Sequence, residues 1–191
     1  MLNQFFDKYI FTNTLKYAHN NFYLVNLPFV IAPTDLLLTL CSVPDQKFQR
    51  KIYSSVKEDA KKTFLPRFSE LGIEKEKELS FLKILFTASG WGKIEVIDKN
   101  DETKRAIVVI DNSPFAQALR GKVQFPVDTI LRGLFAGVFS ALFNVDVDCV
   151  ESECVALNHQ NCKLIIKPKI EFDLTSKIVQ EQIPFEDERT D

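Results

Sequence analysis

The clearest apolar pattern in the chain recurs every four residues between Gln46 and Leu71. Charged side chains fill the positions between, so we predict an amphipathic helix with one stripe facing a core. Pro66 is expected to kink or end this helix, and Gly72 marks the latest point at which it can stop. The apolar stripe comprises Phe48, Ile52, Val56, Ala60, Phe64 and Phe68.

A second helical pattern runs from Val127 to Leu142 and has the best helical periodicity in the chain. One side of this helix is large and apolar. The other side carries small residues, among them Gly133, Ala136 and Gly137. Its backbone can therefore approach a sheet or a partner helix closely.

Strand patterns lie on both sides of this second helix. Lys93–Ile97 and Arg105–Ile110 flank a turn-like sequence, which predicts a β-hairpin. Two more strands are expected near Val145–Val155 and Cys162–Ile170. Phe22–Ala32 is rich in β-branched and aromatic residues and is expected to form one further strand, with Pro28 at an edge or a bulge.

Helices therefore come first, followed by an antiparallel meander that one long helix interrupts. This order predicts an α+β fold, an antiparallel sheet with helices packed on it. We expect a single domain over residues 21–170, preceded by an N-terminal arm or helix at 1–20. Residues 171–191 are expected to be an acidic, frayed tail.

Composition narrows the class of protein. The chain has 191 residues, 46% of them apolar, and a formal net charge of −2. These values exclude a disordered protein, and such a balance predicts no binding to nucleic acid. There is neither a signal peptide nor an apolar run long enough to span a bilayer, so we expect a cytoplasmic location. In that reducing compartment the four cysteines are expected to be thiols or metal ligands.

Motifs for nucleotide binding and nucleophilic catalysis are absent from the sequence. It contains no GxGxxG, no GxxxxGK[ST] and no GxSxG, and its only histidines are His19 and His159. Because no acid–base pair or activated nucleophile is evident, we do not expect an enzyme.

Three of the four cysteines gather between Asp148 and Ile165. A hairpin in this segment would bring Glu151, Cys154 and Cys162 together at one end of the sheet. Thiolate and carboxylate ligands of this kind suit Zn²⁺, which takes four ligands in structural sites. From the spacing alone, a metal site and a pair of buried apolar thiols are about equally expected.

The chain resembles the 4-vinyl reductase domain family over about residues 20–168. The segments that carry the resemblance are Trp91 in a Gly-Trp-Gly turn, Ser113–Ala116, Pro126–Gly137, and Glu151–Cys154 with Cys162. That family is related in fold to the Bet-three-type subunits of TRAPP vesicle-tethering complexes, and it includes sensor domains for phenol-like compounds. The resemblance implies this fold and a ligand-binding role rather than reductase chemistry.

In the aromatic-sensing members, zinc is held by a Cys near the start of the long helix and by a Glu-x-x-Cys-x₇-Cys set. Glu151, Cys154 and Cys162 match that set, and Asp128 falls at the first position. The resemblance thus implies a structural zinc site with Asp128 as the fourth ligand. Cys149 and His159 are the alternatives, and Asp128 is otherwise a residue favoured by the helix dipole.

The resemblance also implies an apolar cavity between the helices and the sheet. The alternative for each candidate wall residue is that it simply packs in the core. This alternative is weakest for Trp91, whose indole N–H needs a partner if it is buried. The candidates are Phe81, Phe86, Trp91, Phe115, Phe125, Phe135 and Phe139.

These observations favour a regulatory or sensor domain that binds an apolar small molecule and acts through a homodimer or a protein partner. The first alternative is a TRAPP-like tethering module whose apolar channel holds a lipid, with Cys41 either an acylation site or a buried thiol. The second is an accessory protein of a tetrapyrrole reductase. The small-residue face of the long helix and the aromatic N-terminal arm favour the homodimer.

Overall fold

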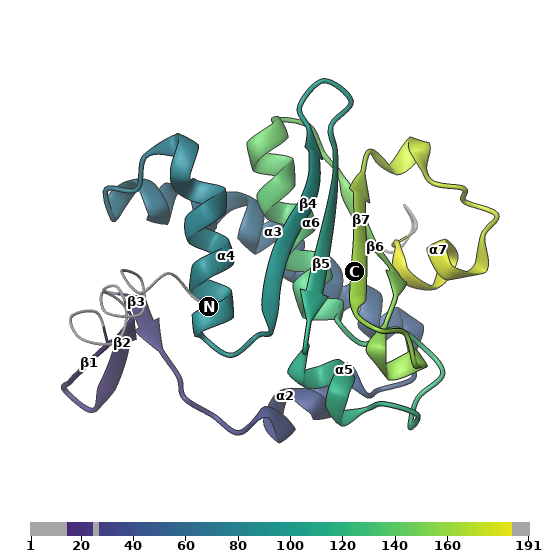
Figure 1. Cartoon of the computed structure of the whole chain (residues 1–191), viewed down its shortest axis with the longest axis horizontal. Coiled ribbons are helices and arrows are strands. Elements are labelled where there is room, and N and C mark those ends of the chain that lie inside the picture. The colour runs from purple at the N-terminus through teal and green to yellow at the C-terminus, as the bar shows by residue number, and fades with distance from the viewer. Residues whose placement is uncertain (1–14, 25–26, 185–191) are drawn as a thin grey trace.

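A four-stranded antiparallel sheet lies at the centre of the molecule (Figure 1). The structure is a computed structural model, and it describes residues 15–24 and 27–184. The strand order is β4-β5-β7-β6. The predicted hairpin, the two later strands and the α+β fold are confirmed, with shorter bounds for the later strands. The strands are β4 (Lys93–Asn100), β5 (Arg105–Asp111), β6 (Asp148–Glu153) and β7 (Cys162–Lys167).

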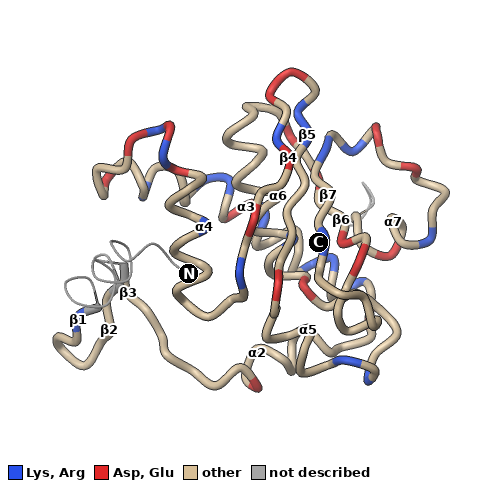
Figure 2. The backbone as a smooth tube through the Cα atoms, in the orientation of Figure 1, with Lys and Arg blue, Asp and Glu red and all other residues tan. Residues whose placement is uncertain are grey.

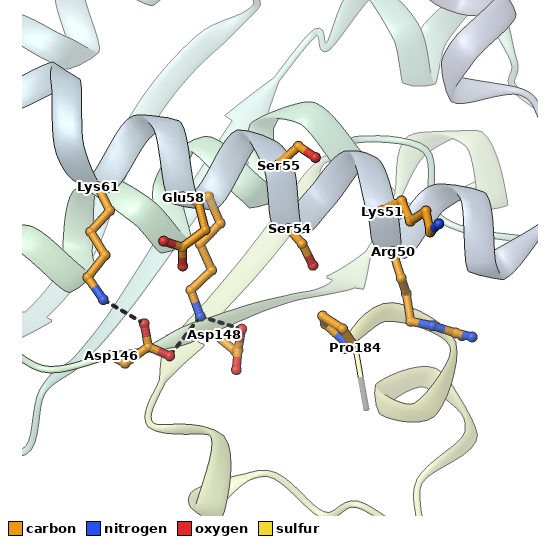
Figure 3. Close-up of a pocket in the computed structure, with 10 residues that line it drawn as sticks. Arg50, Lys51, Ser54, Ser55, Glu58, Lys61, Asp146, Asp148 and Pro184 are labelled. Carbon is orange, nitrogen blue, oxygen red and sulfur yellow. Dashed lines mark hydrogen bonds and ion pairs between the residues drawn. The ribbon is translucent and has the colours of Figure 1, made fainter. Parts of the chain in front are cut away.

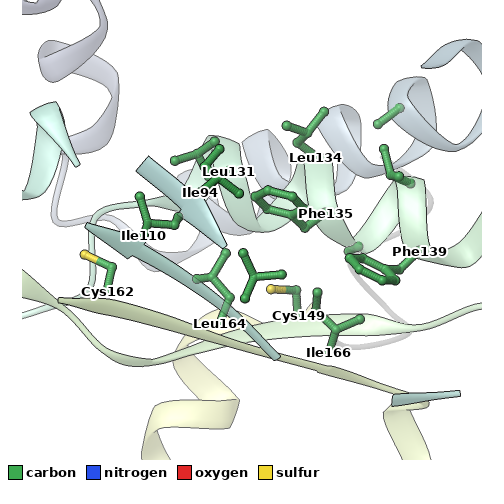
Figure 4. Packing of buried hydrophobic residues seen from close by; sticks show 14 of the residues in the cluster. Ile94, Ile110, Leu131, Leu134, Phe135, Phe139, Cys149, Cys162, Leu164 and Ile166 are labelled. Carbon is green, nitrogen blue, oxygen red and sulfur yellow. The ribbon is translucent and has the colours of Figure 1, made fainter. Parts of the chain in front are cut away.

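Two long helices form layers on one face of this sheet. Helix α6 (Thr129–Phe143) packs on β6 and β7, and helix α3 (Gln46–Glu70) packs on the other side of α6. Figure 4 shows Phe135 and Phe139 of α6 above the sheet residues Leu164 and Ile166. All four side chains are buried, so the main core lies between α6 and the sheet.

The small-residue face of α6 is covered by α3 of the same chain. A Cβ at Gly137 would lie 2.3 Å from the Lys57 carbonyl oxygen, and one at Gly133 would lie 2.7 Å from that of Tyr53. Only glycine permits this approach. The face is therefore occupied within the chain and gives no support to the predicted homodimer.

Helix α3 differs from the prediction in two ways. It continues through Pro66 to Glu70 rather than ending there. The predicted stripe position Ala60 is fully buried, whereas Val56 is only half-buried, and a neighbouring line that includes Tyr53 and Lys57 is buried instead. The buried line is shifted because the two glycines of α6 draw in the backbone of α3 at these residues.

A second, three-stranded sheet stands at one side of the molecule (Figure 1). The prediction of one strand over Phe22–Ala32 is wrong, because β2 and β3 divide this segment. Pro28 lies in β3, which pairs only with β2 among the described strands, so its predicted edge position is confirmed. The strands are β1 (Leu15–Ala18), β2 (Asn21–Leu24) and β3 (Leu27–Phe29). Residues 1–14 of the expected arm lie outside the described residues.

Shorter helices complete the fold. Helix α2 packs against α5, and α4 packs against β4. None of the helices in the described ranges is long and apolar enough to cross a membrane. The elements are α2 (Thr34–Cys41), α4 (Glu78–Ala88), α5 (Pro114–Ala118) and the 3₁₀ turns η2 (Lys75–Lys77), η3 (Val155–Leu157) and η4 (Lys169–Glu171).

The C-terminal segment is more ordered than a frayed tail. Helix α7 (Lys177–Gln182) packs on β6, and Phe172, Val179 and Ile183 form a small cluster with Val150. This cluster covers the outer side of β6 and makes that strand buried on both faces. Residues 185–191 lie outside the described residues, and the division into domains stays a prediction.

Charged residues of both signs are interleaved along the chain (Figure 2). This agrees with the near-neutral net charge of −2. The expectation that the chain does not bind nucleic acid stays a prediction.

Candidate functional site

The β6–β7 connection brings the three predicted ligands Glu151, Cys154 and Cys162 together. One ligand atom from each lies within 4.8 Å of the other two, and all three residues are buried. Glu151 lies on β6, Cys154 directly after it, and Cys162 begins β7. The hairpin inferred from their spacing is therefore present and places two thiols and a carboxylate at one point.

The loop between the two cysteines keeps this geometry. Asn158 adopts the left-handed φ of 70°, which asparagine tolerates well. The His159 backbone N–H donates to the Cys154 carbonyl at 3.2 Å, and the Cys154 N–H donates to Nδ1 of His159 at 3.2 Å. His159 thus closes the loop through its Nδ1 and is not part of the three-residue cluster.

Asp128 lies beside the cluster at the N-cap of α6. Its backbone N–H donates to Glu151 Oε2 at 3.0 Å, and the Ser113 hydroxyl donates to Asp128 Oδ1 at 2.7 Å. Its side chain makes no capping hydrogen bond to α6, contrary to what a purely helix-capping role would require. Cys149, the other alternative, is buried between α6 and the sheet and lies outside the cluster.

The electrostatics of this cluster favour the binding of a cation. Burial, and next the charge of Asp128, raises the pKa of Glu151 well above its usual range. Burial likewise raises the pKa of Asp128, against hydrogen bonds from Ser113 and Cys162. Asp128 Oδ2 and Glu151 Oε1 are both buried without a partner among the described residues.

The two thiols are coupled to one another. A hydrogen bond from Cys162 lowers the pKa of Cys154, and the same bond raises the pKa of Cys162. Two sulfur donors and two carboxylates with free lone pairs form a set that fits a tetrahedral Zn²⁺ ion. A metal is the group that would satisfy both unpartnered oxygens at once.

The predicted wall residues fall into two separate aromatic groups. Trp91 is half-buried, and its ring centroid lies 5.6 Å from that of Phe86 and 5.4 Å from that of Phe115. This group, called here the Trp91 cluster, continues through Phe86, Phe64, Phe68 and Phe81. Phe135 and Phe139 instead form a file with Phe143 inside the main core. The expectation that all six line one cavity is therefore not met by their ring contacts, and Phe125 is half-buried outside both groups.

A groove of about 730 Å³ runs along α3 (Figure 3), and the sequence analysis did not find it. Lys57 lies at its floor and donates to Asp148 Oδ1 at 2.8 Å and to Asp146 Oδ2 at 3.0 Å. The Tyr53 hydroxyl also donates to Asp148, at 2.9 Å. Lys57 is only 5% exposed, although its place between apolar positions predicted a solvated side chain. The pairing of this lysine with two acids far along the chain leaves no local sequence signal.

The comparisons with known proteins agree with the fold. The family model of the 4-vinyl reductase domain matches residues 106–168. Residues 106–168 form a 4-vinyl reductase domain. This segment holds β5, α6 and the whole candidate metal cluster, so the predicted resemblance is confirmed. No curated protein matches the chain.

Solved structures extend the likeness beyond this segment. The phenol-responsive sensory domain of the transcription activator PoxR with phenol is 18% identical, covers 90% of this chain and 92% of its own, and has a TM-score of 0.67. Trafficking protein particle complex subunit 3 from Naegleria fowleri, covalently bound to palmitic acid, is 14% identical, covers 71% and 89%, and has a TM-score of 0.50. At these identities the likeness establishes the fold, and the segment matched by the family model lies in its C-terminal half.

Proposed function

We propose that the chain is a sensor domain that binds an apolar small molecule at the Trp91 cluster and is held together by a structural zinc ion. The observation that carries the proposal is the pair of unpartnered buried oxygens beside two thiols, in a chain that also holds a half-buried aromatic cluster. The fold shared with a phenol-responsive sensory domain over nine-tenths of the chain supports it.

Zinc would be held by Asp128, Glu151, Cys154 and Cys162. Bound there, it supplies a crosslink between the start of α6 and the β6–β7 hairpin, and it neutralises buried negative charge. Four protein ligands leave no open position on the ion, so we propose no catalytic role for it and none for the chain.

The proposed route of a signal starts at the Trp91 cluster. Phe115 contacts the Trp91 ring and lies on α5, and Ser113, the N-cap of α5, donates to Asp128 at the start of α6. A ligand that displaces Phe115 would thereby move α5 and change the hold of Ser113 on Asp128. The metal cluster gives this movement a fixed point on the sheet.

Zinc analysis of the purified full chain tests the metal site. We expect one equivalent in the wild type and loss of most of it in Cys154→Ser and in Cys162→Ser. Cys41→Ser is the matched control, because Cys41 is equally buried but stands outside the cluster. A wild-type content below about a third of an equivalent would count against the site.

Titration with phenol, followed by Trp91 fluorescence, tests the ligand site. Trp91 is the only tryptophan, so the signal reports this cluster alone. We expect a saturable change that Phe115→Leu weakens and that Phe143→Leu, a buried phenylalanine of the other group, leaves in place. No saturable change with phenol or with other apolar aromatic compounds would contradict the ligand site.

We also propose that the chain forms a homodimer through its N-terminal sheet and the segment that follows. Val30 is 82% exposed, Ile31 61% and Leu36 66%, which makes this the most apolar exposed stretch of the described chain. Sedimentation at micromolar concentration should show a dimer that Ile31→Asp with Leu36→Asp converts to monomer. A wild type that sediments only as monomer would overturn this part.

The TRAPP-like tethering role is the second candidate, and Cys41 decides between the two. Burial, and next the charges of Asp128 and Glu151, raises the pKa of the Cys41 thiol to about 12, which leaves little thiolate for acylation. Native mass spectrometry separates the candidates, because an exchangeable small molecule supports the sensor and a covalent acyl adduct supports the tether. We place the chain in the cytoplasm, where its four free thiols stay reduced.

A further inference from the structure

Arg132 of α6 is a buried guanidinium with one donor left over. The side chain is 2% exposed and lies over the Tyr53 ring at 5.0 Å. Its terminal nitrogens donate to the Gln182 carbonyl at 3.1 Å, the Cys149 carbonyl at 3.4 Å and the Thr129 hydroxyl at 3.4 Å. Its Nε is buried and has no partner among the described residues. A buried donor without a partner is costly, so something is expected to accept from it.

A buried acceptor without a partner lies in the same cavity. Gln49 of α3 is 7% exposed, and its Nε2 donates to the carbonyls of Leu40 at 2.8 Å and Val43 at 2.9 Å. These two bonds fix the orientation of the amide and leave its Oε1 buried with no donor in the described chain. Gln49 and Arg132 both line a cavity of about 50 Å³.

This pair of atoms selects the chemistry of an occupant. An anion would accept from Arg132 Nε but would turn its lone pairs toward Gln49 Oε1. A cation would meet the guanidinium. A neutral hydroxyl group satisfies both atoms, because its oxygen accepts from Nε while its hydrogen is donated to Oε1.

The remaining walls are suited to a short carbon chain. Val43, Pro44, Phe125 and Pro126 give the cavity apolar sides. A water-sized occupant takes about 10–15 Å³ of such volume, so this cavity has room for roughly three to five heavy atoms. Pro44 is exposed, which gives the cavity a route to solvent.

We propose that this cavity is a binding site for a small neutral alcohol, held by Arg132 Nε and Gln49 Oε1. The proposal deepens the proposed ligand-binding function, on which it rests for its biological role, but it uses a site distinct from the Trp91 cluster. Gln182 also donates to the Glu151 carbonyl at 3.0 Å and accepts from the Glu151 N–H at 2.8 Å. An occupant that steadies Arg132 would thus steady the segment that carries a metal ligand.

Three probes of equal size test the proposal on the zinc-loaded full chain. Propan-2-ol donates and accepts, acetone only accepts, and acetate is an anion. The readout is the NMR signal of the Arg132 Nε–H, assigned by its absence in Arg132→Met. We expect propan-2-ol to shift this signal saturably and to bind about tenfold more tightly than either other probe, because each of them leaves one buried atom unsatisfied.

Gln49→Met should reduce the preference for propan-2-ol over acetone to less than about threefold, because the acceptor is gone. Gln46→Ala is the matched control, since Gln46 lines the same cavity from an exposed position. Tightest binding by acetate, equal binding of all three, or no shift with any of them, which would mean ordered water only, would each overturn the proposal. These outcomes leave phenol binding at Trp91 unaffected, so failure here and failure of the proposed function are distinguishable.

Discussion

The chain buries acidic side chains in two regions and treats them in opposite ways. At the groove along α3, Lys57 lies between Asp146 and Asp148, so the chain supplies the cation itself. At the metal cluster, Asp128 and Glu151 are buried beside two thiols, and each keeps an oxygen without a partner. Buried carboxylates are stable when they are paired or bind a metal. The difference teaches that the second region is built for a cation from outside the chain.

The pKa shifts follow this difference. Burial favours a higher pKa for Asp146, yet the charge of Lys57 and hydrogen bonds from Lys57 and Lys61 outweigh it and lower the value. The pKa of Glu151 is instead raised, because burial and the neighbouring Asp128 act in the same direction. The first region is therefore balanced as an ion pair, and the second has the negative charge that a bound metal would neutralise.

Removing the metal should produce the largest effect. A ligand present at a thousandfold above its Kd adds about 4 kcal/mol to the free energy of unfolding. Such a loss lowers Tm by roughly 8–16 °C in a domain of this size. Chelation, measured by thermal denaturation, should lower Tm by this amount in the wild type and leave Cys162→Ser almost unchanged. An equal loss in both would show that the chelator acts elsewhere.

Removing the internal cation tests the other region. Lys57→Met leaves Asp148 buried without its ion pair, and breaking a buried pair costs about 3–5 kcal/mol. Urea denaturation should show this loss, and adding Asp148→Asn to the same chain should restore part of it. The control is Lys62→Met on the same helix, whose exposed pair with Glu58 should contribute no more than about 0.5 kcal/mol. Similar losses for Lys57→Met and Lys62→Met would contradict the comparison.

The position of Lys57 depends on α6, which Gly137→Ala tests. In an isolated helix this change stabilises by about 1 kcal/mol. Here the new Cβ would lie 2.3 Å from the Lys57 carbonyl oxygen and 2.7 Å from the Ala60 Cβ, so α3 must move. We expect a net destabilisation of about 1–3 kcal/mol by urea denaturation. The sign decides, since a stabilised variant would mean that the two helices are not in close contact.

The sequence carried enough information to predict the metal cluster, for a local reason. Glu151, Cys154 and Cys162 lie within one hairpin, and the period of a strand and a short loop are enough to bring them together. Asp128 came only from the family resemblance, because its position depends on how α6 meets the sheet. The fold class followed in the same way from the order of patterns along the chain.

The groove and the alcohol site could not be predicted, because they depend on contacts between distant segments. Lys57 has the place of a solvated residue in the pattern of α3, and it is buried because Gly137 draws the helix in and Asp146 and Asp148 arrive from the other half of the chain. The unpartnered atoms of Gln49 and Arg132 emerge only after every other hydrogen bond is assigned. The aromatic residues were likewise assigned to one cavity because composition does not tell which rings meet.

The smallest effect is expected for Asp146, the exposed end of the ion-pair network. Its side chain is 46% exposed, so solvent screens its pairs with Lys57 and Lys61. Because its pKa is lowered in the folded state, the stabilisation is complete at pH values above the usual pKa of 3.8 and is lost as the pH falls through the lower folded value. Asp146→Asn should therefore be slightly less stable than the wild type at neutral pH, and the difference should vanish in acid. Denaturation across this range checks the sign, and Asp59→Asn on α3 controls for the loss of a charge. A difference that grew in acid would mean that Asp146 is held as the neutral acid, like the carboxylates of the metal cluster, and the contrast between the two regions would fail.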